Sequence, residues 1–261
     1  MRTIHGIAAA LFLLGLGGAD ADAAGPGAGA PAVVLASDAI QPFLAADREG
    51  NLYAVFIHSG NISVAVSRDR GKTFSTPASA VDAGGKARGG LQRGPRIGAG
   101  PGGRVFVTVP LVLDEKEYEK RYPTADICLV ESKDGGKTWT RPLRLNEVPK
   151  KAPEALHWLA VDPSGTAHVA WLDIREREKG QDIFYSRVSG EKVGKNRKVA
   201  AEVCECCAPG LAVDGAGNPF LAYREGGARP SREIYAVRST NKGDSFGKPF
   251  RLNPSQSRVG G

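Results

Sequence analysis

A turn pattern that recurs three times along the chain places the strongest constraint on how this sequence can fold. Its clearest copy has the form Ser-x-Asp-x-Gly-x-Thr-Trp and is made of Ser132, Asp134, Gly136, Thr138 and Trp139. The two less complete copies are made of Ser67, Asp69, Gly71, Thr73 and Phe74, and of Ser239, Asn241, Gly243, Ser245 and Phe246. An aspartate in such a turn accepts backbone N–H groups, and the glycine adopts a positive φ that a side chain would forbid. Because each copy follows a strand-like run, the pattern predicts β-hairpins at one recurring place in a repeat.

The repeat extends beyond these turns, because four segments of the chain fit one template of four short strands. Between the first and second strands, the equivalent positions are Asp47, Gly100, Asp162 and Asp214. They are 53, 62 and 52 residues apart, and the longest interval includes an insertion at 110–125. Four short strands per repeat predict an all-β fold, a β-propeller of four-stranded antiparallel blades with four recognisable blades. Residues 32–36 are expected to add an outer strand before the first blade.

The N-terminus has the features of a secretory signal peptide at 1–24, followed by a linker at 25–31. A basic start at Arg2 and His5 precedes an apolar run at 7–16, and small residues follow that run. The run is too short to span a membrane comfortably, so we expect no membrane span after cleavage; an uncleaved anchor is the alternative. The domain at 32–261 is therefore expected to be secreted or periplasmic.

The charge of the chain bears on its partners. The formal net charge is +7, from 35 Lys and Arg residues against 28 Asp and Glu residues. A basic exported protein favours acidic partners such as anionic glycans, although the same charge also serves solubility alone. The basic residues are scattered and form no basic helix, which argues against nucleic acid. The expected partner is a glycan or an extracytoplasmic protein.

The recurring turn resembles the Asp-box, or BNR repeat, which is a hairpin signature of sialidase-like β-propellers. The resemblance covers most of the chain after residue 31 and identifies an architecture, not a reaction. Members of this family normally have six blades, and four are recognisable at 32–261. The chain is therefore expected to be a four-bladed form, a truncated gene product, or part of an assembly that another chain completes. The resemblance implies that the Asp-box turns are structural. It also implies that ligands bind near the axis on the opposite rim, where the loops between second and third strands lie.

Two carboxylates occupy equivalent positions at the ends of the second strands in neighbouring blades. They are Asp173 and Glu225, and Arg175 and Arg224 lie beside them in the sequence. Paired carboxylates near arginines can act as general acid and base on a glycosidic bond. The alternative is that the two carboxylates form solvated ion pairs with these arginines.

Sialidases use three arginines for the substrate carboxylate, together with a Tyr–Glu nucleophile pair and an aspartate acid/base. The resemblance makes Tyr223 a candidate catalytic residue beside the two carboxylates. The candidate ligand-binding residues on the same rim are Arg96, Arg175, Arg224, Arg232 and His58. The sequence departs from the family at Gly98, which stands where the family's Arg-Ile-Pro motif has its proline.

Three of the four cysteines lie in one segment, at Cys204, Cys206 and Cys207. In an exported protein this favours a disulfide, and we expect Cys204 to be joined to Cys206 or Cys207. Three thiolates within four residues also suit a soft metal such as Cu or Zn, although the spacing is not that of a structural zinc site. No other cofactor is expected. Cys128 lies within a strand-like run and is expected to be a buried thiol.

The sequence therefore predicts an exported propeller that binds a glycan or a protein through its loop rim. One alternative is an exo-acting glycoside hydrolase of the sialidase type. Another is a metal-handling or redox protein that uses the cysteine cluster. The sequence does not decide between an enzyme and a binding protein.

Overall fold

The computed structural model describes residues 32–254, except 88, 91, 121–123, 154, 177–179 and 227–232. The chain divides into two units, Met1–Ala32 and Val33–Gly261, and only Ala32 of the first is among the described residues. The predicted signal peptide and linker lie outside the described residues, as does Arg232. No helix in the described part of the chain is long and apolar enough to cross a membrane.

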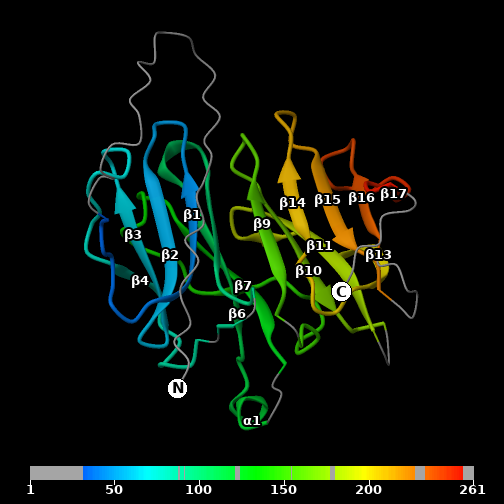
Figure 1. The fold of residues 1–261 in the computed structure, drawn as a ribbon, viewed down its shortest axis with the longest axis horizontal. Coiled ribbons are helices and arrows are strands. Elements are labelled where there is room, and N and C mark those ends of the chain that lie inside the picture. Colours follow the sequence, from blue (N-terminus) through cyan, green and yellow to red (C-terminus); the bar gives the residue numbers. More distant parts are fainter. Residues whose placement is uncertain are drawn as a thin grey trace. The chain divides into compact units, whose positions relative to one another are not determined.

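Four antiparallel sheets, here called blades 1 to 4, follow one another along the second unit (Figure 1). Blade 1 contains β1 (Ile40–Ala46), β2 (Leu52–His58), β3 (Asn61–Ser67) and β4 (Ala78–Val81). Blade 2 contains β5 (Arg96–Ala99), β6 (Val105–Leu111), β7 (Asp126–Ser132) and β8 (Leu143–Arg144). Blade 3 contains β9 (His157–Val161), β10 (Ala167–Asp173), β11 (Gln181–Ser189), β12 (Lys192–Val193) and β13 (Arg197–Val203). Blade 4 contains β14 (Gly210–Val213), β15 (Pro219–Arg224), β16 (Ile234–Arg238) and β17 (Phe250–Arg251). The predicted all-β arrangement of four-stranded antiparallel blades is confirmed, and blade 3 adds the short strand β12.

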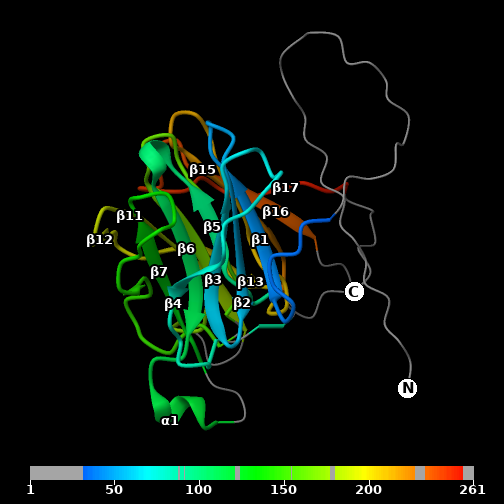
Figure 2. The same cartoon turned by 90° about the vertical axis from the view of Figure 1, so that its left-hand side faces the viewer.

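The sheet order places the connections on two opposite rims. The turns between first and second strands and between third and fourth strands lie at one end, which we call the turn rim. In blade 2 these two turns touch, because Gly135 N–H donates to the carbonyl of Gly103 over 2.9 Å. The loops between second and third strands, and those between blades, lie at the other end, which we call the loop rim. The insertion after β6 forms the short helix α1 (Glu115–Tyr118), which projects from the loop rim (Figures 1 and 2).

Consecutive blades pack face to face, so the middle strands bury both of their faces. Val105, Val107 and Val109 of β6 face the core shared with blade 1, whereas Phe106 faces the core shared with blade 3. In β10, Trp171 faces blade 2 while Leu172 faces blade 4. A strand of this kind is apolar at nearly every position, which explains why its sequence shows little alternation between polar and apolar residues.

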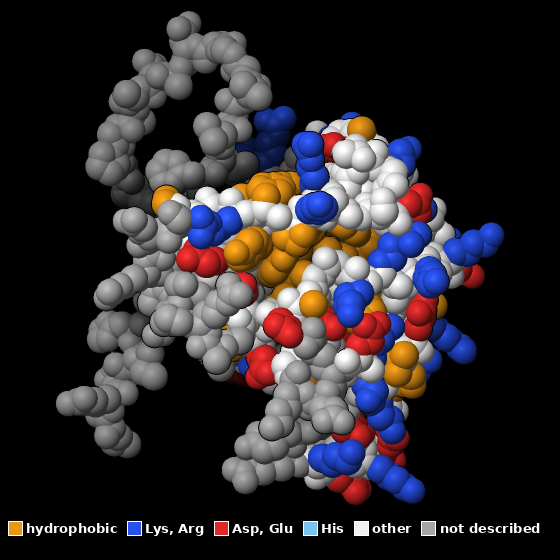
Figure 3. Space-filling model, turned by 90° about the vertical axis from the view of Figure 1, so that its right-hand side faces the viewer, with side chains coloured by type: hydrophobic (Ala, Val, Ile, Leu, Met, Phe, Trp, Pro, Cys, Tyr) orange, Lys and Arg blue, Asp and Glu red, His pale blue; other side chains and the backbone are white. Residues whose placement is uncertain are grey.

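The two end blades have outer faces that no other blade covers within the described residues. On blade 1, Leu35, Ala36 and Ala39 pack against Phe56 and its neighbours. The expected outer strand at 32–36 is wrong, because this segment has no strand pairing and covers the sheet with side chains instead. On blade 4, Phe220 and Phe250 are 38% and 43% exposed, with ring centroids 6.0 Å apart. Figure 3 shows this side of the molecule, where hydrophobic side chains gather at the surface.

The aspartate turns are held by dense local hydrogen bonds. Asp134 Oδ1 accepts the hydroxyl of Ser132 at 2.8 Å and the backbone N–H groups of Lys137 at 3.0 Å and Thr138 at 2.9 Å. Its Oδ2 accepts the Thr138 hydroxyl at 2.6 Å. These bonds, that of the Thr138 hydroxyl first, hold the Asp134 pKa well below its ordinary value.

An asparagine makes the same turn in blade 4 without a charge. Asn241 Oδ1 accepts the hydroxyl of Ser239 at 2.8 Å and the N–H of Ser245 at 2.9 Å. Its Nδ2 donates to the Ser245 hydroxyl at 2.9 Å, in the place where Asp134 accepts from Thr138. The turn therefore depends on the acceptor positions more than on the negative charge.

We predict that Asp134→Ala lowers the melting temperature by a few degrees at neutral pH, because the turn loses its acceptors. Asp134→Asn, which reproduces the residue type found in the turn of Asn241, should cost much less. Because the folded pKa is depressed, the charge contributes stability that is present above the unfolded pKa of about 3.9 and is lost as pH falls through the folded value. The stability difference between wild type and Asp134→Asn should therefore shrink in acid. Unchanged melting of Asp134→Ala with loss of ligand binding would show that the turn is not structural.

Candidate functional site

A cavity of about 560 Å³ lies at the turn rim, where the first turns of all four blades meet. We call it the axial cavity. Each blade contributes its turn between first and second strands, and the lining residues are Ala46, Asp47, Arg48, Glu49, Ala99, Gly100, Pro101, Val161, Asp162, Pro163, Val213, Asp214 and Gly215. The cavity therefore lies on the rim opposite to the one that the resemblance implies. The alignment of the four repeats could have predicted the cavity, because it places Asp47, Asp162 and Asp214 at equivalent positions.

Three carboxylates of the cavity are fixed by their own turns. Asp47 accepts the backbone N–H of Asn51 at 2.8 Å and the side-chain amide of Asn51 at 2.7 Å. It also accepts the Tyr53 hydroxyl at 3.0 Å. Asp214 accepts the N–H groups of Ala216 at 2.9 Å and Asn218 at 2.8 Å, together with the Asn218 amide at 3.1 Å.

The charge state of these carboxylates follows from the same bonds. Burial acts to raise the pKa of Asp47, but hydrogen bonds from Asn51 and Tyr53 outweigh it and keep the pKa below its ordinary value. For Asp214, the N–H of Asn218 makes the largest contribution to a lowered pKa. Both carboxylates are therefore ionised at neutral pH, and with Asp162 and Glu49 they make the cavity acidic in a protein of net positive charge.

The third carboxylate, Asp162, continues into a buried polar chain within blade 3. Its Oδ2 lies 3.3 Å from His168 Nε2, and His168 Nδ1 lies 2.6 Å from the Tyr185 hydroxyl. Burial lowers the pKa of His168 despite the neighbouring carboxylate, so the imidazole is neutral at pH 7. His168 lies six residues after Asp162, and Tyr53 lies six residues after Asp47. In blades 1 and 3, a side chain of the second strand therefore contacts the cavity carboxylate.

On the loop rim, Asp173 and Arg175 form a buried ion pair. Asp173 is fully buried. Its Oδ2 accepts hydrogen bonds from Arg175 Nη2 at 2.6 Å and from Trp171 Nε1 at 2.9 Å. Its Oδ1 accepts the backbone N–H of Arg175 at 2.8 Å. The guanidinium also donates to Asn196 Oδ1 at 3.0 Å and lies over the ring of Phe184. The geometry favours the ion-pair alternative over a general acid or base, although the pair is enclosed and not solvated as that alternative supposed.

Arg96 is a second enclosed arginine, at the blade axis on the loop rim. It is 6% exposed, and its guanidinium lies 5.0 Å from the ring centroids of both Phe43 and Trp158. It donates to the carbonyls of Gln92 at 2.9 Å and Gly94 at 3.2 Å. Arg96 thus joins blades 1, 2 and 3 through cation–π contacts.

The remaining candidates have separate surroundings. Tyr223 stacks on Tyr235, with ring centroids 6.1 Å apart. The backbone of Glu225 forms a β-bridge with Val203. His58 ends β2, where it pairs with Asn61 across the hairpin. A three-arginine site for a carboxylate, formed by Arg96, Arg175 and Arg224, stays a prediction.

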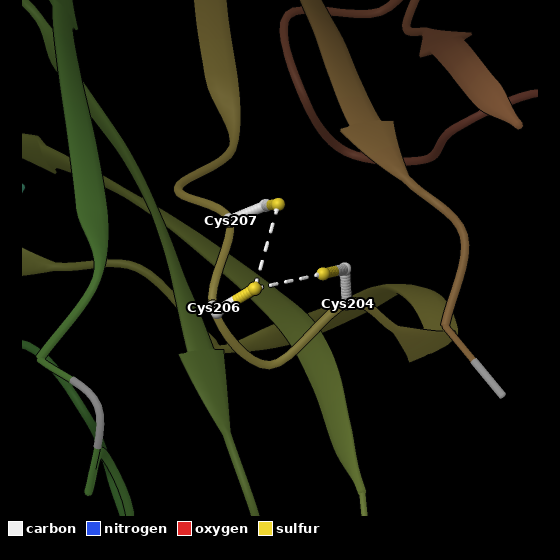
Figure 4. Close-up of side chains that lie close together, drawn as sticks. All are labelled: Cys204, Cys206 and Cys207. Carbon is white, nitrogen blue, oxygen red and sulfur yellow. Dashed lines mark hydrogen bonds between the residues drawn. The ribbon is translucent and has the colours of Figure 1, made fainter. Parts of the chain in front are cut away.

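The three clustered cysteines lie on the loop between β13 and β14 (Figure 4). Cys204 Sγ is 3.4 Å from Cys206 Sγ, and Cys206 Sγ is 3.9 Å from Cys207 Sγ. Arg224 Nη1 approaches Cys207 Sγ at 3.8 Å. Cys128 is a buried thiol in β7, and burial raises its pKa to about 12.

No family model matches the sequence, and no curated protein matches it. Solved structures do match the fold. An ulvan lyase of a polysaccharide lyase family is 14% identical, with a TM-score of 0.57 over 82% of this chain and 56% of the lyase. An α-L-arabinofuranosidase from Fusarium graminearum is 15% identical, with a TM-score of 0.56 over 82% of this chain and 66% of that chain. A protein of unknown function from Dyadobacter fermentans is 16% identical, with a TM-score of 0.52 over 82% of this chain and 68% of that chain. These matches show the propeller fold, and this chain spans little more than half the length of the ulvan lyase.

We predict that Asp173→Asn destabilises the protein by about 3–5 kcal/mol, because it removes the carboxylate at 2.6 Å from Arg175 and leaves only the exposed Glu147 at 4.0 Å as a charged partner. The matched control is Glu176→Gln, which breaks an exposed pair with Lys198 and should cost less than about 1 kcal/mol. The double variant Asp173→Asn, Arg175→Met should recover much of the loss. Urea unfolding measures all three. Lost glycosidase turnover in Asp173→Asn at unchanged stability would instead assign Asp173 to catalysis.

Proposed function

We propose that this chain is an exported β-propeller of the sialidase-like, Asp-box class that binds a glycan in the axial cavity. The observation that carries the proposal is the convergence of four equivalent turns on one cavity of about 560 Å³. Ligand sites in proteins have volumes of this order and combine apolar walls with a few fixed polar groups. Here the fixed groups are the carboxylates of Asp47, Asp162 and Asp214.

These carboxylates suit the hydroxyl groups of a sugar. Hydrogen bonds from their own turns fix the positions of the Asp47 and Asp214 carboxylates at the cavity wall. A ligand hydroxyl that donates to such an ionised carboxylate forms a charge-assisted hydrogen bond. The apolar walls at Val161, Val213 and Pro101 can contact the C–H face of a sugar ring.

The charge of the cavity selects among glycans. Its lining contains four carboxylates, on Asp47, Glu49, Asp162 and Asp214, and one cation, on Arg48. A uronate or sulfate group would be repelled there, so the ligand we propose is a neutral glycan. This replaces the acidic partners that the net charge of the whole chain favours.

The fold neighbours support a carbohydrate ligand but not its neutral charge, because the ulvan lyase is bound to -[GlcA(1-4)Rha3S]-, which is anionic. The ulvan lyase and the arabinofuranosidase are both proteins that act on carbohydrates, and both share the propeller architecture. The predicted signal peptide at 1–24 would bring the domain to a secreted or periplasmic location, where it would encounter extracellular polysaccharides. Asp173 itself does not favour the sialidase-type hydrolase, because it is engaged by Arg175 and Trp171.

We predict that Gly215→Trp weakens glycan binding by about tenfold or more. Gly215 lines the cavity, and a side chain there meets no atom within 4 Å, so the indole ring can take up space that the glycan would occupy. The matched control is Gly210→Trp in β14 at the loop rim, where a side chain also meets no atom within 4 Å. Neither glycine has a positive φ, so both variants should fold. Isothermal titration with neutral arabino- and xylo-oligosaccharides, beside oligouronates, measures the affinities.

The two variants also test the choice of rim. If Gly210→Trp abolishes binding while Gly215→Trp leaves it intact, the ligand lies on the loop rim and the proposal is wrong. Tighter binding of the oligouronates would overturn the choice of a neutral glycan. Binding should also weaken as pH falls through the depressed pKa values of Asp47 and Asp214, because protonation removes the negative charge that strengthens the hydrogen bonds.

A further inference from the structure

The cysteine cluster lies on the loop rim, so it is independent of the axial cavity on the turn rim. Cys204 directly follows β13 and is 3% exposed, whereas Cys206 is exposed and Cys207 is half-buried. One thiol is therefore enclosed by the protein while the other two reach the surface. A small ligand can approach the cluster from solvent and still contact an enclosed sulfur.

The sulfur positions fit a three-coordinate metal. All three Sγ atoms lie within 4.8 Å of one another, with separations of 3.4 Å and 3.9 Å along the loop (Figure 4). Three sulfurs that surround one metal at about 2.3 Å in a plane are about 4 Å apart. A disulfide needs a bond of about 2.05 Å, so the thiols must move together to form one.

The backbone around the cluster is fixed by blade 4. Cys204 N–H donates to the Arg224 carbonyl at 2.9 Å, and Gly226 N–H donates to the Glu202 carbonyl at 2.8 Å. A Cβ on Gly226 would lie 2.5 Å from the carbonyl oxygen of Val203, so only glycine allows the two segments to come so close. The start of the loop, at Cys204, is thus held between the end of β13 and the residues that end and follow β15.

Arg224 supplies a positive charge to the cluster. Its Nη1 approaches Cys207 Sγ at 3.8 Å, and its buried Nε and Nη2 have no hydrogen-bond partner in the part of the chain that the structure describes. The guanidinium is therefore placed to offset the negative charge of thiolates.

We propose that Cys204, Cys206 and Cys207 together bind one Cu(I) ion, with Arg224 as the neighbouring charge. Thiolates are the ligands that Cu(I) prefers. Zinc favours four ligands, whereas the group of ligand atoms found among the described residues contains three. Each thiol that binds releases its proton to solvent, and the copper remains Cu(I) throughout. Three thiolates and Cu(I) carry a net charge of −2, which Arg224 reduces.

The test is an anaerobic titration of the purified full chain with Cu(I), in competition with a Cu(I) chelator, without prior treatment by reductant. We expect one Cu(I) per chain, a thiolate-to-copper absorption band in the near ultraviolet, and four titratable thiols in the unfolded copper-free protein. Cys206→Ser, at an exposed position, should fold normally and no longer bind one Cu(I) per chain. Cys207→Ser is the second variant, with the same expected loss.

Cys128→Ala is the matched control and should still bind one Cu(I). Arg224→Gln should weaken binding by about tenfold, and Arg224→Lys by less.

Two results would overturn the proposal. Two missing thiols in the purified protein, with no uptake of copper, would show that the cluster is a disulfide, as the sequence favours. Copper retained at full stoichiometry by both Cys206→Ser and Cys207→Ser would place the metal elsewhere. Because the readouts are copper and thiol counts, failure here would not affect the glycan proposal, and the Gly215→Trp result would not affect this one.

Discussion

Face-to-face burial of consecutive blades is the interaction on which the rest of this structure depends. No single four-stranded sheet of this size can cover both of its own faces. Blade 2 buries Val107 against blade 1 and Phe106 against blade 3, and blade 3 buries Trp171 against blade 2 and Leu172 against blade 4. Stacking in sequence order brings the first strands together at the axis. That placement makes the four first turns converge on the axial cavity.

The two rims differ in how their connections are held. On the turn rim, carboxylates or amides such as Asp134 and Asn241 accept backbone N–H groups of their own turns. On the loop rim, two of the connections are held by contacts with other blades. Arg96 reaches Phe43 and Trp158 there, and the cysteine loop is held by β15.

The two proposed sites use opposite chemistry on these opposite rims. The axial cavity offers hard, ionised oxygen acceptors whose positions are set by their own turns. The cysteine cluster offers soft sulfur ligands beside Arg224, at the junction of blades 3 and 4. Arg175 shows why an arginine beside a carboxylate need not mark a ligand site, because its partner Asp173 is fully buried and serves the interior of blade 3.

The sequence by itself determined the fold class and the order of strands, because turn chemistry and strand length are local properties. The spacing of Asp47, Asp162 and Asp214 already carried the repeat register, although not the fact that the three positions surround one cavity. Only the tertiary structure decided that Asp173 is enclosed, that Arg96 packs over two aromatic rings, and that Arg224 reaches Cys207. These contacts join residues from different strands or blades. Their partners are chosen by how the sheets pack, which no local pattern encodes.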